Sequence, residues 1–191
     1  GSSGSNSGDR CQVHSGWYAA AQSVTKQVKA EVRRLLKVFP RYSLKLTGHS
    51  LGAAIATISA LNLHNADGGG GDQPQLFPQL VTFGSPRVGT RLFAQCFASS
   101  LQTSIRFTHR RDTVVHMVLP FRGYVHGCRE AYEASGNTRF SSPEIRGCST
   151  IACADGEDDP ECAAQWDFLE TNMADHNRYL GVGMYCDAVK Y

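Results

Sequence analysis

The segment Lys45-Leu-Thr-Gly-His-Ser-Leu-Gly-Ala-Ala-Ile-Ala56 places a serine between two glycines, where one hydrophobic pattern gives way to another. Residues 44–47 alternate apolar and polar side chains, which predicts a short strand. Residues 51–63 are apolar nearly all round, which predicts a buried helix. The pentapeptide at 48–52 therefore fits a strand-to-helix elbow that exposes a nucleophilic serine.

The glycines and the first helical amide have predicted roles at this elbow. We expect side chains at Gly48 and Gly52 to collide with the neighbouring strand and helix. Ser50 is then the predicted nucleophile. The N–H of Leu51, at the positive end of the helix, is the predicted oxyanion-hole donor. A turn serine without function is the alternative for the pentapeptide alone.

Strands and helices alternate along the chain. Helical spacing covers residues 17–39 and 90–101, and short strands are predicted at 80–83 and 104–108. We expect an α/β fold with a mostly parallel central sheet, right-handed crossovers and helices on both faces. Residues 123–134 predict one or two short strands, and residues 148–165 predict mostly loop.

Composition excludes several classes of function. The 191 residues are 41% hydrophobic with a net charge of +2, which suits one globular domain and gives no sign of nucleic-acid binding. Residues 51–63 are too short to span a bilayer. The acidic loop 155–159 lacks a calcium-loop pattern, and we expect no metal or cofactor. Residues 1–10 resemble a leader or linker.

Seven cysteines favour disulfides and an extracellular location over zinc binding. We expect Cys153 to pair with Cys162, with Cys148 as the alternative partner of Cys153. Cys96 is predicted to be a buried free thiol on an apolar helix face. The odd count predicts at least one unpaired thiol in this chain, and Cys11 and Cys186 are expected to have their partners outside it.

A serine nucleophile needs a histidine base and an acid that orients the histidine. In this fold class both follow the nucleophile along the chain. Asp112 lies just beyond the strand at 104–108, where the acid should be. The alternative for Asp112 is a surface ion pair with Arg110 or Arg111, which would contribute little.

Three histidines follow Asp112. His116 is expected to be too close in sequence to fold back onto it, and His126 lies in a predicted strand. His176 remains as the base, although spacing alone leaves a structural role for it equally open.

Six blocks of sequence resemble the class 3 (fungal-type) lipases, which share their fold with fungal feruloyl esterases. In family order they are Val13-His-Ser-Gly-Trp17, Thr47-Gly-His-Ser-Leu-Gly52, Thr82-Phe-Gly-Ser-Pro-Arg-Val-Gly89, Thr108-His-Arg-Arg-Asp112, Gly123-Tyr-Val-His126 and Asp175-His-Asn-Arg-Tyr-Leu-Gly181. The resemblance implies an α/β-hydrolase fold and ester hydrolysis through an acyl-enzyme, without a cofactor. It also implies that Ser50, Asp112 and His176 are the catalytic residues.

The resemblance begins in the middle of the family pattern. We therefore expect residues 11–191 to be the C-terminal major part of one α/β-hydrolase domain, without the family's lid and second oxyanion donor, and not a competent enzyme alone. Smaller departures are Trp17 where the family usually has Phe, Ala53 where a third glycine is common, and a loop at 116–119 that is usually richer in proline.

The sequence thus predicts an extracellular carboxylic ester hydrolase that acts on acylglycerols or related lipid esters at an oil-water interface. A feruloyl-type esterase acting on plant cell-wall esters has the same chemistry and remains open. A catalytically silent lipase-like fragment is the third possibility. Oligomeric state cannot be predicted from these patterns.

Overall fold

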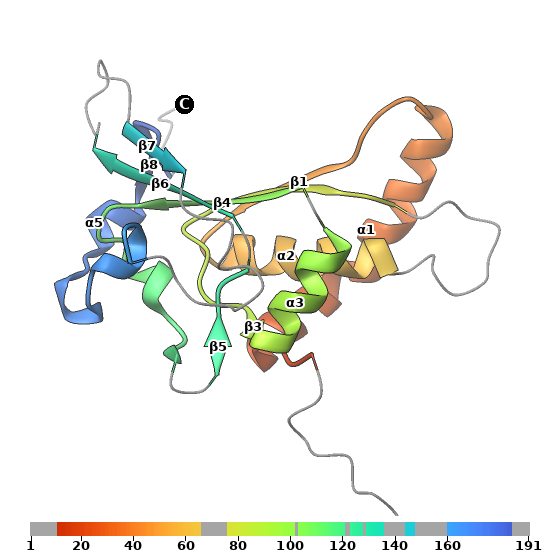
Figure 1. The fold of residues 1–191 in the computed structure, drawn as a ribbon. Coiled ribbons are helices and arrows are strands. Elements are labelled where there is room, and N and C mark those ends of the chain that lie inside the picture. Colours follow the sequence, from red (N-terminus) through yellow and green to blue (C-terminus); the bar gives the residue numbers. More distant parts are fainter. Residues whose placement is uncertain are drawn as a thin grey trace, which may run out of the picture.

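A five-stranded sheet runs through the molecule in the order β1-β2-β4-β6-β7 (Figure 1). The computed structural model describes residues 11–65, 76–101, 103–120, 123–127, 129–135, 144–147 and 160–184. Four strands are parallel, namely β1 (Lys45–His49), β2 (Gln79–Phe83), β4 (Ser104–His109) and β6 (Glu130–Ser135). β7 (Glu144–Gly147) pairs with β6 in the antiparallel direction.

Three long helices accompany the sheet, α1 (Ser15–Val38), α2 (Leu51–Asn65) and α3 (Arg91–Ser100). In Figure 1, α2 and α3 lie on the same side of the sheet, and α1 packs against α2. The strand order explains the shared side of α2 and α3. The β1-α2-β2 and β2-α3-β4 connections both move in the same direction across the sheet. Because crossovers between parallel strands are almost always right-handed, both helices lie on the same face of the sheet.

Different segments of the chain pack on the two faces of the sheet. Leu80 on β2 is buried in the same core cluster as Ala54 and Ala56 of α2. On the opposite face, Tyr179 packs its ring against Phe83, with ring centroids 5.8 Å apart. This contact brings the C-terminal part of the described chain to the carboxyl end of the sheet.

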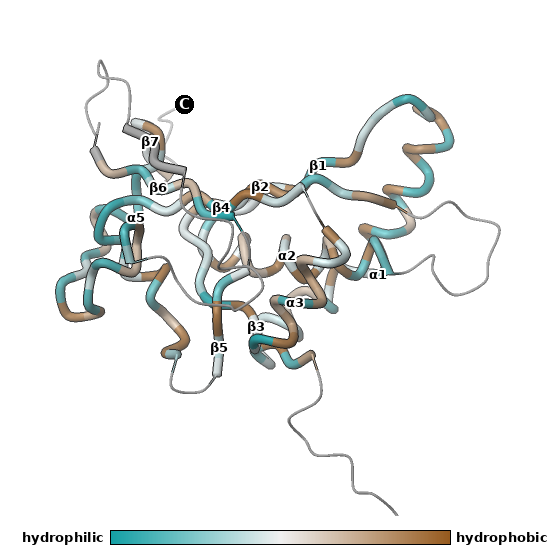
Figure 2. Tube along the Cα trace, in the orientation of Figure 1, coloured by the Kyte–Doolittle hydropathy of each residue, from teal (hydrophilic) through white to brown (hydrophobic). Residues whose placement is uncertain are grey.

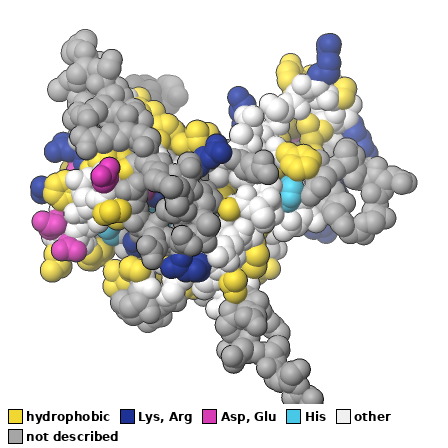
Figure 3. Space-filling model, in the orientation of Figure 1, with side chains coloured by type: hydrophobic (Ala, Val, Ile, Leu, Met, Phe, Trp, Pro, Cys, Tyr) yellow, Lys and Arg dark blue, Asp and Glu magenta, His cyan; other side chains and the backbone are white. Residues whose placement is uncertain are grey.

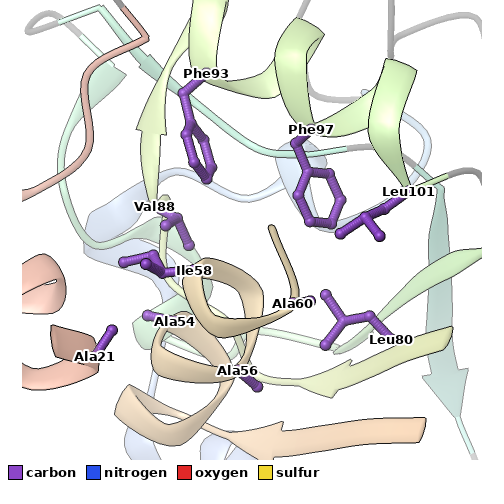
Figure 4. Packing of buried hydrophobic residues seen from close by; sticks show 10 residues of the cluster. All are labelled: Ala21, Ala54, Ala56, Ile58, Ala60, Leu80, Val88, Phe93, Phe97 and Leu101. Carbon is purple, nitrogen blue, oxygen red and sulfur yellow. The ribbon is translucent and has the colours of Figure 1, made fainter. Parts of the chain in front are cut away.

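The main core lies where α1, α2 and α3 meet the sheet (Figure 4). Phe93 and Phe97 of α3 fill the space beside the small side chains of α2. Figure 2 shows the hydrophobic character of α2 and the more mixed surface of α1. The buried members of this cluster are Ala21, Ala54, Ala56, Ile58, Ala60, Leu80, Val88, Phe93, Phe97 and Leu101.

Short elements complete the described chain. Two small antiparallel ladders are formed by β3 (Gly89–Thr90) with β5 (Tyr124–Val125), and by β8 (Arg178–Tyr179) with β9 (Val182–Gly183). Short helices are η1 (Val114–His116), η3 (Ala163–Gln165), η4 (Phe168–Glu170) and α5 (Met173–His176). One or two strands were predicted within 123–134, and the structure has two there, β5 and β6, of which β6 joins the main sheet. Much of the predicted loop at 148–165 lies outside the described residues.

The cysteines correct two predictions. Cys96 is not a free thiol, because it forms a disulfide with Cys11 across a separation of 85 residues. Cys11 therefore has its partner within this chain. Cys162 is also disulfide-bonded. Cys148, Cys153 and Cys186 lie outside the described residues, so their predicted pairings stay predictions.

On the face drawn in Figure 3, the charged side chains of the described residues do not form one basic patch. On the side of the molecule drawn in Figure 3, Lys and Arg are scattered, and acidic side chains gather at the end that carries α5. Within the described part of the chain, no helix is long and apolar enough to cross a membrane.

Candidate active site

Ser50 stands at the junction between β1 and α2 in a strained conformation. Its φ of 58° lies in the left-handed region, which residues other than glycine rarely adopt. Its N–H donates to the carbonyl of Phe83 on the neighbouring strand at 3.0 Å, which ties the turn to the sheet. A strained serine at a strand-to-helix junction is the arrangement that the sequence predicted.

The two flanking glycines differ in importance. A Cβ on Gly48 would lie 2.3 Å from the carbonyl oxygen of Gly52 and 2.7 Å from the nitrogen of Ala53. A Cβ on Gly52 would meet nothing within 4 Å. The prediction that both glycines avoid a collision is therefore correct for Gly48 and wrong for Gly52, because Gly52 faces open space on the first turn of the helix.

This difference gives a stability prediction. Gly48→Ala should lower the free energy of unfolding by at least ~2 kcal/mol, as in other overpacked cores, because backbone atoms must move. Gly52→Ala should leave it unchanged or raise it by about 0.5–1 kcal/mol, since alanine favours a helix over glycine. Urea unfolding of the two variants beside the parent chain measures both effects. Equal destabilisation by the two substitutions would contradict the assigned close contact at Gly48.

Asp112 and His176 form a buried pair. His176 Nδ1 lies 3.0 Å from Oδ1 and 2.9 Å from Oδ2 of Asp112. Since a carboxylate only accepts, His176 carries its proton on Nδ1, and Nε2 is left to accept a proton. Asp112 is 1% exposed and His176 is 4% exposed. The surface ion pair considered for Asp112 is excluded by this burial.

The Asp112 carboxylate receives two further hydrogen bonds. The backbone N–H of Val114 donates to Oδ1 at 2.7 Å, and the hydroxyl of Tyr179 donates to Oδ2. Burial raises the pKa of Tyr179 well above its usual value, and the Asp112 charge acts in the same direction. Tyr179 therefore stays protonated and keeps its hydrogen to donate.

The other two histidines have structural partners. His116 contacts Asp112 only through the backbone, with Nδ1 3.0 Å from the carbonyl oxygen of Asp112 and Nε2 3.1 Å from that of Ala163. His126 places Nε2 2.8 Å from the carbonyl oxygen of Val115. His176 is thus the histidine whose ring meets the acid.

The chain segment that carries His176 is anchored on the end of β4. His109 donates from Nδ1 to the carbonyl of Asp175 at 2.9 Å, and the N–H of Arg111 donates to the Asp175 carboxylate at 3.2 Å. The N–H of Asn172 donates to the carbonyl of Arg111 at 2.7 Å. These bonds fix the backbone on both sides of the Asp112 and His176 pair.

Gly84 allows the backbone after β2 to approach this pair. Its φ is 56°, and a Cβ there would lie 2.8 Å from Oδ2 of Asp112 and 3.0 Å from Nδ1 of His176. Tyr179 and Gly84 were not singled out from the sequence, although both belong to the quoted family blocks. No spacing rule in the sequence identifies them as neighbours of Asp112.

Ser50 itself is not hydrogen-bonded to His176. Neither the Ser50 hydroxyl nor His176 Nε2 has a hydrogen-bond partner among the residues that the structure describes. The predicted chain of bonds is therefore present between Asp112 and His176 and absent between His176 and Ser50. Catalytic hydrogen bonds are often long in unliganded enzymes and shorten when substrate binds.

A strained serine at a helix N-terminus, together with a buried Asp and His pair on later segments, defines the α/β-hydrolase class. A family model for lipase (class 3) matches residues 2–121. The chain belongs to the class 3 lipase family.

Known relatives agree with this assignment. Secreted mono- and diacylglycerol lipase 1 of Fusarium solani is 34% identical over 145 residues, which cover 74% of this chain and 41% of that protein. A lipase structure from Rhizopus microsporus var. chinensis matches with a TM-score of 0.78 at 26% identity, over 92% of this chain and 56% of that one. A triacylglycerol lipase whose catalytic centre is described as a serine protease triad matches with a TM-score of 0.78 at 27% identity, over 95% of this chain and 63% of that one.

These matches confirm the predicted family and fold. The chain spans less than half the length of the Fusarium relative. The predicted relation to feruloyl esterases stays a prediction. Within the described residues, no group of three or more His, Cys, Asp or Glu side chains could hold a metal ion.

Proposed function

We propose that this chain carries the catalytic residues of a lipase-type carboxylic ester hydrolase, with Ser50 as nucleophile, His176 as base and Asp112 as the acid that orients it. The observation that carries the proposal is the buried Asp112 carboxylate bonded to His176 Nδ1, which leaves Nε2 as a proton acceptor. The strained Ser50 at the start of α2 supplies the hydroxyl.

The reaction follows from these positions. Ser50 Oγ attacks the ester carbonyl carbon and transfers its proton to His176 Nε2, and Asp112 stabilises the imidazolium that forms. The Leu51 N–H and the N-terminal end of α2 stabilise the oxyanion. His176 then gives its proton to the leaving alcohol, which departs and leaves an acyl-enzyme on Ser50. Water, activated by the same base, releases the acid.

The Leu51 N–H is the oxyanion donor that can be assigned among the described residues. A single donor of this kind typically contributes ~10²–10³ in turnover.

The proposed substrates are acylglycerols or related lipid esters at an oil-water interface. The relatives named as lipases support this class, and the half-exposed Leu51 places an apolar side chain next to the nucleophile. The same relatives, some named as secreted, and the Cys11 to Cys96 disulfide support an extracellular location.

Hydrolysis of three esters tests the substrate class. We expect p-nitrophenyl butyrate and p-nitrophenyl palmitate to be cleaved, and methyl ferulate to be cleaved more slowly. Preference for methyl ferulate would replace the lipid substrate by a feruloyl ester and keep the mechanism. No cleavage of any ester, with no acyl-enzyme by mass spectrometry, would favour a silent fragment.

Tyr179 gives a prediction for this mechanism. Tyr179→Phe removes one of the hydrogen bonds to the Asp112 carboxylate, and bonds of that kind correspond to about 10- to 100-fold in rate. We expect kcat for p-nitrophenyl butyrate to fall by this factor with KM little changed. Tyr42→Phe, at a side chain that is 69% exposed, is the matched control. Equal activity of the two variants would remove Tyr179 from the mechanism.

A further inference from the structure

His49, the residue directly before Ser50, lies against the ring of His176. The two ring centroids are 4.4 Å apart, and the planes are inclined by 28°, so the rings are stacked. His49 Nε2 also lies 2.9 Å from the backbone carbonyl oxygen of His176. His49 therefore contacts His176 both through its ring and through the main chain.

The protonation of His49 follows from its surroundings. A carbonyl oxygen only accepts, so His49 carries a hydrogen on Nε2 and donates it. Burial lowers the pKa of His49 and the charge of His176 adds to this, while the bond to the His176 carbonyl and the charge of Asp112 act against it. The third titratable group that faces His49 is Tyr179, whose ring packs edge-on at 5.8 Å. His49 is thus a neutral ring at neutral pH.

We propose that His49 is a positioning residue for the base: its ring supports the His176 imidazolium, and its N–H holds the backbone of His176 in place. This inference rests on the proposed function, because it needs His176 to become a cation during the reaction. A cation is attracted to the face of a neutral aromatic ring, and the attraction is stronger where water is excluded. His176 is 4% exposed, so water screens the contact poorly.

The two contributions of His49 can be separated by substitution. His49→Phe keeps an aromatic face and loses the N–H donor. His49→Gln keeps an N–H donor and loses the aromatic face. If the ring supports the imidazolium, only His49→Gln makes His176 harder to protonate. The acid limb, which is the fall of kcat/KM at low pH as His176 becomes protonated, then moves to lower pH in that variant.

The experiment measures kcat/KM for p-nitrophenyl butyrate from pH 4 to 9 for the parent chain and both variants. We expect the acid limb of His49→Gln to move down by about 0.5–1 pH unit, the equivalent of one aromatic-cation contact. The acid limb of His49→Phe should stay with the parent, with a smaller loss of kcat. Identical acid limbs in all three proteins, or an equal shift in both variants, would overturn the proposal.

Matched controls come from His64 on α2. His64 Nδ1 lies 2.8 Å from the carbonyl oxygen of Leu76, and its ring packs against Phe77, with centroids 5.2 Å apart. His64→Phe and His64→Gln therefore change a similar environment away from Ser50, and they should leave the acid limb unchanged. A shift of the limb in His64→Gln equal to that in His49→Gln would also overturn the proposal.

Failure of the proposed function is distinguishable from failure of this inference. Ser50→Ala is measured beside the parent chain in the same assay. Equal release of p-nitrophenol by both would reject the proposed function itself. Release of p-nitrophenol by the parent chain but not by Ser50→Ala would support the proposed function. The pH profiles of the two His49 variants would then test the role of His49. Circular dichroism spectra that match the parent show that each variant is folded.

Discussion

Ser50→Ala should lower kcat for p-nitrophenyl butyrate by several orders of magnitude. In serine hydrolases the nucleophile and its base act together, and removing the nucleophile costs up to ~10⁶-fold in kcat. The reason is that alanine has no atom that can form the acyl-enzyme. Residual hydrolysis would come only from the oxyanion donor and from binding. Steady-state kinetics with a highly purified variant measure the difference.

Ser23→Ala is the matched control for this change. The Ser23 hydroxyl lies on α1 and donates to the carbonyl of Ala20. It belongs to a different helix from the one that begins after Ser50. Activity of Ser23→Ala should equal that of the parent. Undiminished hydrolysis by Ser50→Ala would mean that another group attacks the ester, and the assigned mechanism would be wrong.

Asp112→Asn should lower kcat by about 10⁴-fold with little change in the fold. Val114 donates to Oδ1 and Tyr179 donates to Oδ2, so the amide oxygen of asparagine can replace only one of these two acceptors. With that oxygen at the Oδ1 position, the NH₂ group takes the Oδ2 position, which lies 2.9 Å from His176 Nδ1, and the Tyr179 hydroxyl must accept instead of donate. His176 must then accept at Nδ1 and carry its proton on Nε2. In that tautomer the histidine cannot take the proton of Ser50.

The control for Asp112→Asn is Asp167→Asn, which neutralises an exposed carboxylate at the start of η4. We expect it to retain full activity. A loss of less than tenfold in Asp112→Asn would show that the orientation of His176 does not depend on the charge of Asp112.

Much of the fold was predictable because local patterns dominate it. The alternation at 44–47 and the apolar run at 51–63 predicted β1 and α2 to within two residues, and β2, α3 and β4 were predicted in the same way. The position of Asp112 after a strand predicted the acid, whereas spacing alone left a structural role for His176 equally open. The resemblance to the class 3 lipases predicted their pairing.

Other features depend on long-range geometry that no local pattern carries. The face covered by α2 and α3 follows from strand order, which the periodicity of the chain does not contain. The pairing of Cys11 with Cys96 joins segments 85 residues apart, and seven cysteines allow many pairings. The Tyr179 hydroxyl reaches Asp112 only because β8 packs across the end of the sheet.

We propose that Ser50 is a nucleophile activated by the His176 and Asp112 pair, and this assignment can be tested without steady-state kinetics. Its most direct test is intact-mass and peptide-mapping mass spectrometry after incubation with diethyl p-nitrophenyl phosphate, which records one covalent event and does not require fast turnover. We predict one diethylphosphoryl adduct on Ser50 in the parent chain and in His126→Ala, and a rate of labelling reduced by orders of magnitude in His176→Ala. No adduct on Ser50, or labelling at the same rate in His176→Ala, would contradict the account.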